Sequence, residues 1–125
     1  MLRAEQGDIL RVSGISWPVI VVSNNHFNQI GEAIVCPILN NITQNAIHLP
    51  IRISSPAGEI QGNIACEHLR HVDLNVRRYS KLSSLHLADY LDISDTLIAL
   101  FNFSEGTWKI FVHGRHRSFS ALFPL

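Results

Sequence analysis

Three side chains that can share one chemical task lie close together near the middle of the chain. Glu67, Arg70 and His71 bring a carboxylate, a guanidinium and an imidazole into one short segment. A carboxylate or an imidazole can transfer a proton near neutral pH, and a guanidinium stabilises a developing negative charge. These residue types at this spacing make the segment a candidate for acid–base catalysis.

Each of these residues also has an ordinary structural interpretation. Glu67 can be a solvated carboxylate at a strand end, and Arg70 can pair with Asp73 to fix a turn, which contributes about 0–1 kcal/mol on an exposed surface. The chain has seven histidines, so most of them must be incidental. In a regular strand Glu67 and Arg70 point to opposite faces, so they can cooperate only where a bulge or a strand end reorients them.

A positively charged stretch follows the candidate residues. Its basic residues are Arg70, Arg77, Arg78 and Lys81. Once Asp73 is subtracted, residues 70–81 carry an excess of three positive charges. Such a stretch can contact phosphate groups, although charge runs more often form a solvated face. Arg115 to Arg117 form a second, weaker basic cluster.

Composition limits what the whole chain can be. Its 125 residues, 46% hydrophobic and 16% charged, predict one domain with a real core rather than a disordered chain. Ten basic and ten acidic residues leave no net charge, so only local charge can attract a nucleic acid. Cys36 and Cys66 lack metal-ligand spacing, which favours buried thiols, or a disulfide if their backbones are adjacent. We expect no metal, no membrane span and a cytoplasmic location.

The elements that must position these residues are mainly strands. Apolar alternation and short β-branched runs predict strands over 7–12, 19–22, 32–39, 47–53 and 60–68. The continuous apolar run 19–22 suits a central strand that is buried on both faces. Gly62 suggests a bulge or a close approach of two backbones.

The last third of the chain differs in pattern. Apolar residues at near-helical spacing over 87–101 predict an amphipathic helix packed on the sheet, with Ser83 and Ser84 as possible caps. Residues 102–125 form a C-terminal extension in which Trp108 to Val112 is typical of a strand. We therefore divide the chain into a domain of residues 1–101 and an extension of residues 102–125.

Short motifs follow one another in a recognisable order from Gly7 to Lys81. They are Gly7-Asp8, Trp17-Pro18, Val21-Val22-Ser23-Asn24, Asn28, Cys36-Pro37-Ile38, Gly62, Cys66-Glu67 and Arg70-His71-Val72-Asp73. This order resembles the MazF/PemK family of bacterial toxins. The resemblance implies a mainly β fold, a small curved antiparallel sheet or SH3-like barrel with one C-terminal α-helix, that forms a homodimer.

The resemblance also implies an activity. Members of that family are toxins of type II toxin–antitoxin systems that cut single-stranded RNA at selected sequences without a metal or other cofactor, and a cognate antitoxin neutralises them. Glu67 stands where some relatives have an aspartate, so it is the candidate general base or the group that orients one. Arg70 and His71 follow in the matching segment, and RNA would be cleaved through a 2′,3′-cyclic phosphate.

Two positions depart from the family pattern. Trp17 replaces the arginine before the proline of the second strand, and Leu39 replaces the threonine that closes the third strand. Neither side chain supplies a charge. Trp17 is interpreted either as a stacking platform for an RNA base, worth about 1–3 kcal/mol, or as a residue at the rim of the core. The candidate RNA-binding residues are Trp17, Arg77, Arg78 and Lys81.

These departures keep other functions open. A catalytically degenerate relative would keep the dimer and the antitoxin-binding surface and act as a binding module. A gyrase poison like CcdB has a similar fold, and its first loop is short, like residues Ser13 to Ser16 that connect the first two predicted strands here. CcdB acts through a C-terminal Trp-Gly-Ile, whereas this chain ends with Phe123-Pro124-Leu125.

Overall fold

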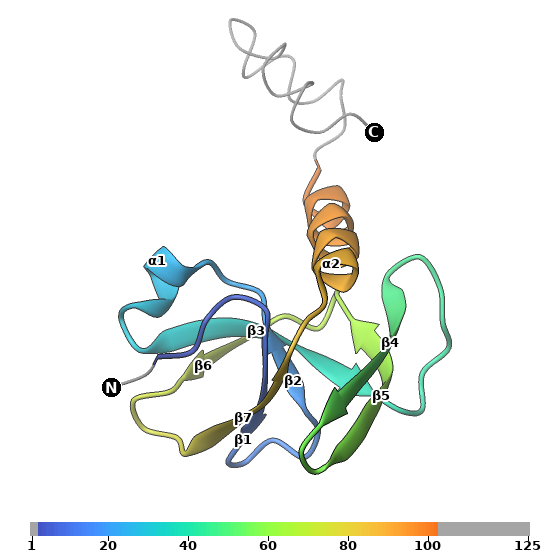
Figure 1. Ribbon diagram of the computed structural model, residues 1–125. Helices are drawn as coiled ribbons and strands as arrows, with labels where there is room; N and C mark the ends of the chain where they lie inside the picture. Colours follow the sequence, from blue (N-terminus) through green and yellow to red (C-terminus); the bar gives the residue numbers. More distant parts are fainter. Residues whose placement is uncertain (1–2, 103–125) are drawn as a thin grey trace, which may run out of the picture.

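Seven strands and two helices make up residues 3–102, the part of the chain that the computed structural model describes (Figure 1). The strands are β1 (Asp8–Val12), β2 (Val19–Val21), β3 (Glu32–Leu39), β4 (His48–Ser55), β5 (Gly58–Ala65), β6 (Arg70–Asp73) and β7 (Tyr79–Ser84). The helices are α1 (Asn25–Asn28) and α2 (Leu87–Leu100). The fold is mainly β with one long C-terminal helix, as the sequence predicted.

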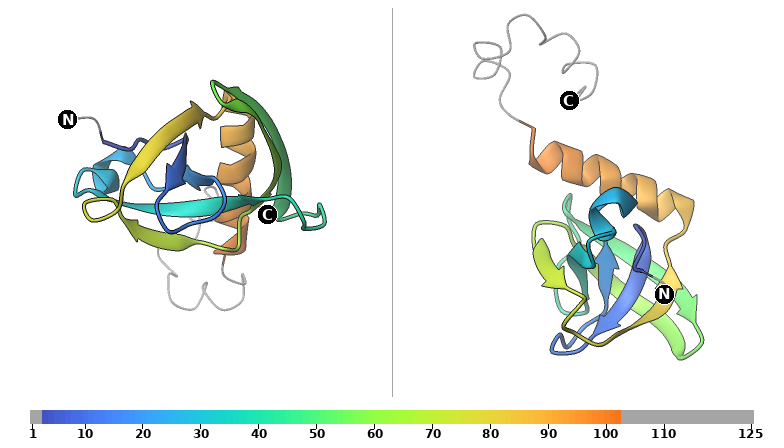
Figure 2. Two further views of the ribbon diagram at one scale, coloured as in Figure 1. Left: turned by 90° about the horizontal axis from the view of Figure 1, so that it is seen from below. Right: turned by 90° about the vertical axis from the view of Figure 1, so that its left-hand side faces the viewer.

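Strand β3 connects the two halves of the sheet. The strands are hydrogen-bonded in the order β4-β5-β3-β2-β1-β7, and every pairing is antiparallel. β6 pairs with the first half of β3, β5 pairs with its end, and β2 pairs along its other edge. The strands curl around a common interior, and α2 lies across one end (Figure 2). Val35, the partner of Arg70, is therefore separated from Leu39 by three residues of β3.

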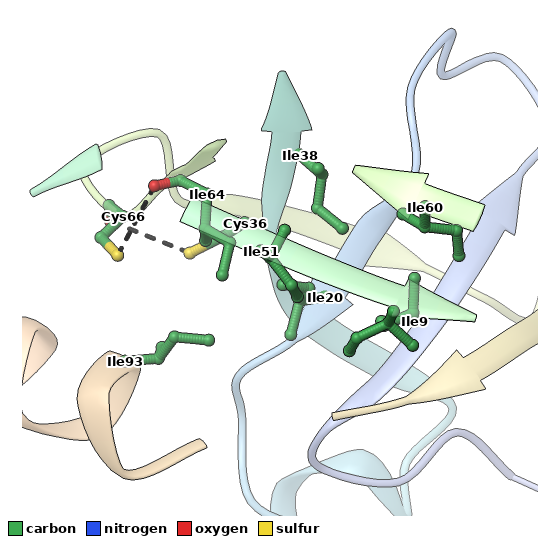
Figure 3. Close-up of a cluster of buried hydrophobic side chains, with 10 residues drawn as sticks. Ile9, Ile20, Cys36, Ile38, Ile51, Ile60, Ile64, Cys66 and Ile93 are labelled. Atoms are coloured by element: carbon green, nitrogen blue, oxygen red, sulfur yellow. Dashed lines mark hydrogen bonds between the residues drawn. The ribbon is translucent and has the colours of Figure 1, made fainter. Parts of the chain in front are cut away.

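The central strand β2 is buried on both faces, as predicted. Val19, Ile20 and Val21 are 2%, 0% and 1% exposed. Ile20 packs into an isoleucine-rich cluster with residues of β1, β3, β4, β5 and α2 (Figure 3), whereas Val19 and Val21 pack into a valine-rich cluster on the opposite face. Because both clusters use β1, β2 and β3, these three strands form the rigid centre of the domain.

Helix α2 is attached to the strands by a narrow stripe of side chains. Ile93 is buried in the isoleucine-rich cluster, towards which it extends in Figure 3, and Leu97 packs beside it. Leu87, Leu91 and Phe101 are exposed. The expected caps Ser83 and Ser84 are wrong, because both belong to β7 and His86 occupies the N-cap position without a side-chain hydrogen bond.

Other boundaries also differ from the prediction. The strand expected over 60–68 ends at Ala65, because the chain turns at Cys66 and Glu67 before β6 begins. Gly62 is a close backbone approach, as expected, because a Cβ there would lie 2.7 Å from the carbonyl oxygen of Leu39. The extension lies outside the described residues apart from Asn102, so the division at residue 101 stays a prediction. Within residues 3–102, no helix is long and apolar enough to cross a membrane.

Candidate functional site

Glu67 lies in the turn after β5, where a hydrogen bond joins it to His48 at the start of β4. The Nε2 atom of His48 is 2.6 Å from Oε2 of Glu67, and Nδ1 is 2.8 Å from the carbonyl oxygen of Thr43. Pairing of His48 with Ala65 across β4 and β5 brings the two segments together. Glu67 therefore lies in a turn at the end of β5, the kind of position that its cooperation with Arg70 requires, and the contact that its side chain makes is with His48.

The geometry around His48 favours its protonated form. The carbonyl oxygen of Thr43 and the carboxylate of Glu67 both accept hydrogen bonds, which favours an imidazolium that donates from both ring nitrogens, and Nδ1 also lies 3.3 Å from the amide nitrogen of Asn45. The hydrogen bond to Glu67, followed by the one to Thr43, raises the pKa of His48. Partial burial alone would raise the pKa of Glu67, but the hydrogen bond and the charge of His48 bring that pKa below its usual value. The two residues form an ion pair with a strongly polarised proton.

This pair makes stability depend on pH with a defined sign. Folding raises the pKa of His48 above 6.5, so its contribution is complete below that value and is lost as pH rises through the folded pKa. Folding lowers the pKa of Glu67 below 4.5, so its contribution is present above that value and is lost as pH falls. We expect His48→Gln to lower the free energy of unfolding most between about pH 4.5 and 6.5.

Urea denaturation at several pH values checks this expectation. His26→Gln is the matched control, because His26 is an exposed histidine on α1. The two variants should differ from each other most in the same pH interval. A loss of stability in His48→Gln that is the same at pH 5.5 and pH 9 would contradict the ion pair.

Arg70 and His71, the other two catalytic candidates, begin β6. Arg70 is exposed, and no ion pair or hydrogen bond engages its side chain within the described part of the chain. His71 is hydrogen-bonded to Glu32 of β3, a residue that pairs with Asp73 at the end of β6 farther from the Glu67 turn. Asp73 accepts a hydrogen bond from the backbone N–H of Asn75 at 2.9 Å, so the alternative ion pair with Arg70 is not formed.

The basic stretch is spread over two strands and the turn between them. Arg77 donates a hydrogen bond to the carbonyl oxygen of Ser13 at 3.1 Å. Nζ of Lys81 lies 3.2 Å from Oδ1 of Asp8, with which it forms an ion pair. Arg78 is exposed. Two of the candidate RNA-binding cations therefore already have partners. Among residues 3–102, no hydrogen bond or ion pair engages the side chain of Arg70 or Arg78, so these two cations of the stretch are available to bind an anion.

Trp17 lines a groove formed where β1, β3 and β5 meet the segment before β2. The groove has a volume of about 620 Å³ and is lined by residues of β1, β3, β5 and the segment before β2. Trp17 and Leu39 both line it, as do Arg11, Asn40 and Gln61. Trp17 is 44% exposed, so its indole contributes to the groove surface. We call this surface the Trp17 groove.

Sequence reasoning missed two residues of these sites. His48 was missed because it is distant from Glu67 in sequence and only the β4–β5 pairing joins them. Arg11 was missed because nothing in its local sequence places it beside residues of β5, with which it lines one groove. The one available signal was that Arg11 is a charged residue within a strand that is otherwise apolar after Asp8.

The two cysteines are free thiols in the isoleucine-rich cluster (Figure 3). The Sγ atom of Cys36 lies 3.8 Å from the carbonyl oxygen of Cys66. Burial, with a smaller contribution from nearby Cys66, raises the pKa of Cys36 to about 12, and burial raises that of Cys66 to about 11. Both are inert as nucleophiles at neutral pH. Within the described residues, no group of histidine, cysteine and carboxylate side chains could hold a metal ion.

Comparison with known proteins identifies similar chains. The model of the PemK-like, MazF-like toxins of type II toxin–antitoxin systems matches residues 13–101. A chain of the MazE–MazF complex from Deinococcus radiodurans superimposes with a TM-score of 0.72 at 16% identity, covering 82% of this chain and 100% of that one. A search among curated proteins gives no match.

Two further solved structures come from mycobacterial species. An endoribonuclease has a TM-score of 0.67 at 16% identity and covers 79% of this chain and 91% of its own. An endoribonuclease in complex with its cognate antitoxin has a TM-score of 0.67 at 14% identity and covers 81% of this chain and 99% of that one. At these identities the structural likeness establishes the fold.

Proposed function

Because this chain belongs to the family of PemK-like, MazF-like toxins of type II toxin–antitoxin systems, we propose that it is a metal-independent endoribonuclease that cuts single-stranded RNA at selected sequences. The observation that carries the proposal is the ion pair of Glu67 and His48, with 2.6 Å between Oε2 and Nε2. It supplies a carboxylate held in its charged form and a proton donor in contact with it. Arg70 provides an open cation after the same turn.

The proposed reaction is an internal transesterification of RNA. The ribose 2′-oxygen forms a bond to phosphorus while the bond from phosphorus to the 5′-oxygen breaks, which yields a 2′,3′-cyclic phosphate and a free 5′-hydroxyl. Glu67 takes the proton of the 2′-hydroxyl, and His71 gives a proton to the departing 5′-oxygen. Arg70 stabilises the charge that develops on the phosphate. Trp17, Arg77, Arg78 and Lys81 are the proposed RNA contacts.

Cleavage of a long single-stranded RNA in EDTA tests this function. We expect discrete cuts with 2′,3′-cyclic phosphate ends, and the same cuts when magnesium is added. Arg70→Gln should reduce the rate, because a neutral amide cannot balance the phosphate charge. Cuts that require magnesium, or an absence of cuts, would refute metal-independent cleavage.

A non-catalytic binding module is the second candidate function. Trp17 and Leu39 favour it, because they line one groove at the two positions where the family pattern has an arginine and a threonine. A protein that binds its cognate antitoxin and RNA but leaves RNA uncut would have this function. In either case the partner is a small antitoxin, as in the complexes of the similar proteins, and the proposed location is the cytoplasm.

A homodimer is the proposed assembly, and the exposed side chains of α2 support it. Leu87 and Leu91 of α2 and its C-cap residue Phe101 are 73%, 51% and 64% exposed, so within residues 3–102 this apolar surface is not covered. We expect light scattering after gel filtration to give the mass of two chains at micromolar concentration. Leu91→Glu should give one chain, whereas Asp92→Ser at a neighbouring exposed position should not. A monomeric wild type would contradict the dimer.

A further inference from the structure

We propose that the Trp17 groove is a nucleotide subsite, in which Arg11 binds an RNA phosphate while the adjacent base stacks on Trp17. The inference rests on the proposed function, because it takes single-stranded RNA as the ligand. It assigns a role to Arg11, which stands outside every motif that resembles the toxin family. It also gives the groove a cation in place of the arginine that Trp17 replaces.

The indole of Trp17 is positioned to stack. Pro18, the next residue, accepts a hydrogen bond through its carbonyl oxygen from Ile38 N–H at 2.9 Å, which fixes the backbone at this point. The side chain is nevertheless 44% exposed on the groove surface. The buried side chains of Ile38 and Ile60 also line the groove, so the face of a base can pack against apolar surface there. Stacking on an aromatic side chain stabilises an RNA base whatever its sequence.

Arg11 is the open cation of the groove. It is exposed on β1, and within residues 3–102 neither a hydrogen bond nor an ion pair engages its guanidinium. The groove also contains Glu59, but Oε1 of its carboxylate lies 3.6 Å from Nε of Arg52, and this ion pair compensates the negative charge of Glu59. An unpaired guanidinium beside an exposed indole provides the two contacts that one nucleotide needs, a cation for the phosphate and a ring for the base.

Amide side chains complete the surface. Asn40, Asn41 and Gln61 line the Trp17 groove, and Asn40, Glu59 and Gln61 also line a neighbouring hollow of about 770 Å³ over β4 and β5. An amide offers both a donor and an acceptor, so it can hydrogen-bond to the exposed edge of an unpaired base. The two hollows share these three residues, so a single-stranded RNA longer than one nucleotide can extend from the Trp17 groove into the neighbouring hollow.

Binding of an RNA that cannot be cleaved tests the subsite. The probe is a short, fluorescein-labelled, fully 2′-O-methylated single-stranded RNA, and the readout is anisotropy over a series of salt concentrations. Arg11→Gln should make the slope of log K against log salt less steep by about 0.7, the value for one phosphate contact in a single strand. Trp17→Leu should weaken binding about 5- to 150-fold at an unchanged slope, and Trp17→Phe should retain most of the affinity.

Arg3→Gln is the matched control, since Arg3 is an exposed arginine outside the groove. It should bind like the wild type. If Arg11→Gln and Arg3→Gln give the same slope, the phosphate contact is refuted even where the wild type cuts RNA. If the wild type does not bind the probe, the subsite is refuted as well. Binding that depends on Arg11 without any cleavage of ordinary RNA would refute the nuclease alone. Thermal unfolding of each variant excludes a loss of fold, and Arg11→Gln alters only an exposed side chain.

Discussion

Glu67→Gln will slow RNA cleavage by about 10²- to 10⁴-fold, the usual loss when a general base is removed. The substitution keeps the size of the side chain and its ability to accept a hydrogen bond from His48. It removes the negative charge that takes up a proton and stabilises the imidazolium. Initial rates on a defined RNA in EDTA, measured at the pH optimum of the wild type, give the effect.

His68→Gln is the control for this experiment. Nε2 of His68 lies 3.7 Å from Oε2 of Glu67, beyond hydrogen-bond distance, and the ring is 59% exposed. Its removal should change the rate by less than about threefold, because the contact is solvent-exposed and makes no hydrogen bond. Equal rates for Glu67→Gln and the wild type would place the proton transfer on another residue. The circular dichroism spectrum must match that of the wild type in both variants.

Ile20→Ala will destabilise the domain by about 2–5 kcal/mol. Ile20 is fully buried in the isoleucine-rich cluster, on a strand whose other face is covered by the valine-rich cluster. Neighbouring strands on both sides limit relaxation, so the cavity stays open. A small domain is stable by about 5–15 kcal/mol in total, so this one change removes a large part of it.

Urea denaturation at a pH between 5 and 6 measures this loss. Ile30→Ala is the matched control, because Ile30 is 56% exposed in the loop after α1. Its effect should stay within about 0.5 kcal/mol. Similar losses in the two variants would mean that β2 is not the packed centre of the fold.

Local pattern was sufficient for the strands with strong β-branched runs. The run at 19–22 predicted a central strand, and Glu32–Leu39 matches its prediction at both ends. β6 and β7 were missed because Arg70–Asp73 is only four residues long and Tyr79–Ser84 has no fully buried residue. Such strands are held by pairing with β3 and β1, which a local pattern does not contain.

The motif order from Gly7 to Lys81 predicted the family, and the family model confirms it. The candidate site was predicted less completely, because its contacts join distant segments. His48 and Glu67 meet through the register of β4 and β5, and His71 meets Glu32 through that of β3 and β6. The roles assigned to Glu67, Arg70 and His71, and to the RNA contacts, stay predictions.

The narrow attachment of α2 has a consequence for hydrogen exchange. Because Ile93 is the one buried residue of the helix, separation of α2 uncovers part of the isoleucine-rich cluster but leaves the valine-rich cluster of β1, β2 and β3 packed. The amide protons of α2 should therefore exchange through a local opening of lower free energy than global unfolding. A protein that binds the opened helix would contact its apolar side chains while the valine-rich cluster stays packed. A partner of this toxin can therefore displace α2 at a lower free-energy cost than any strand of the barrel's centre.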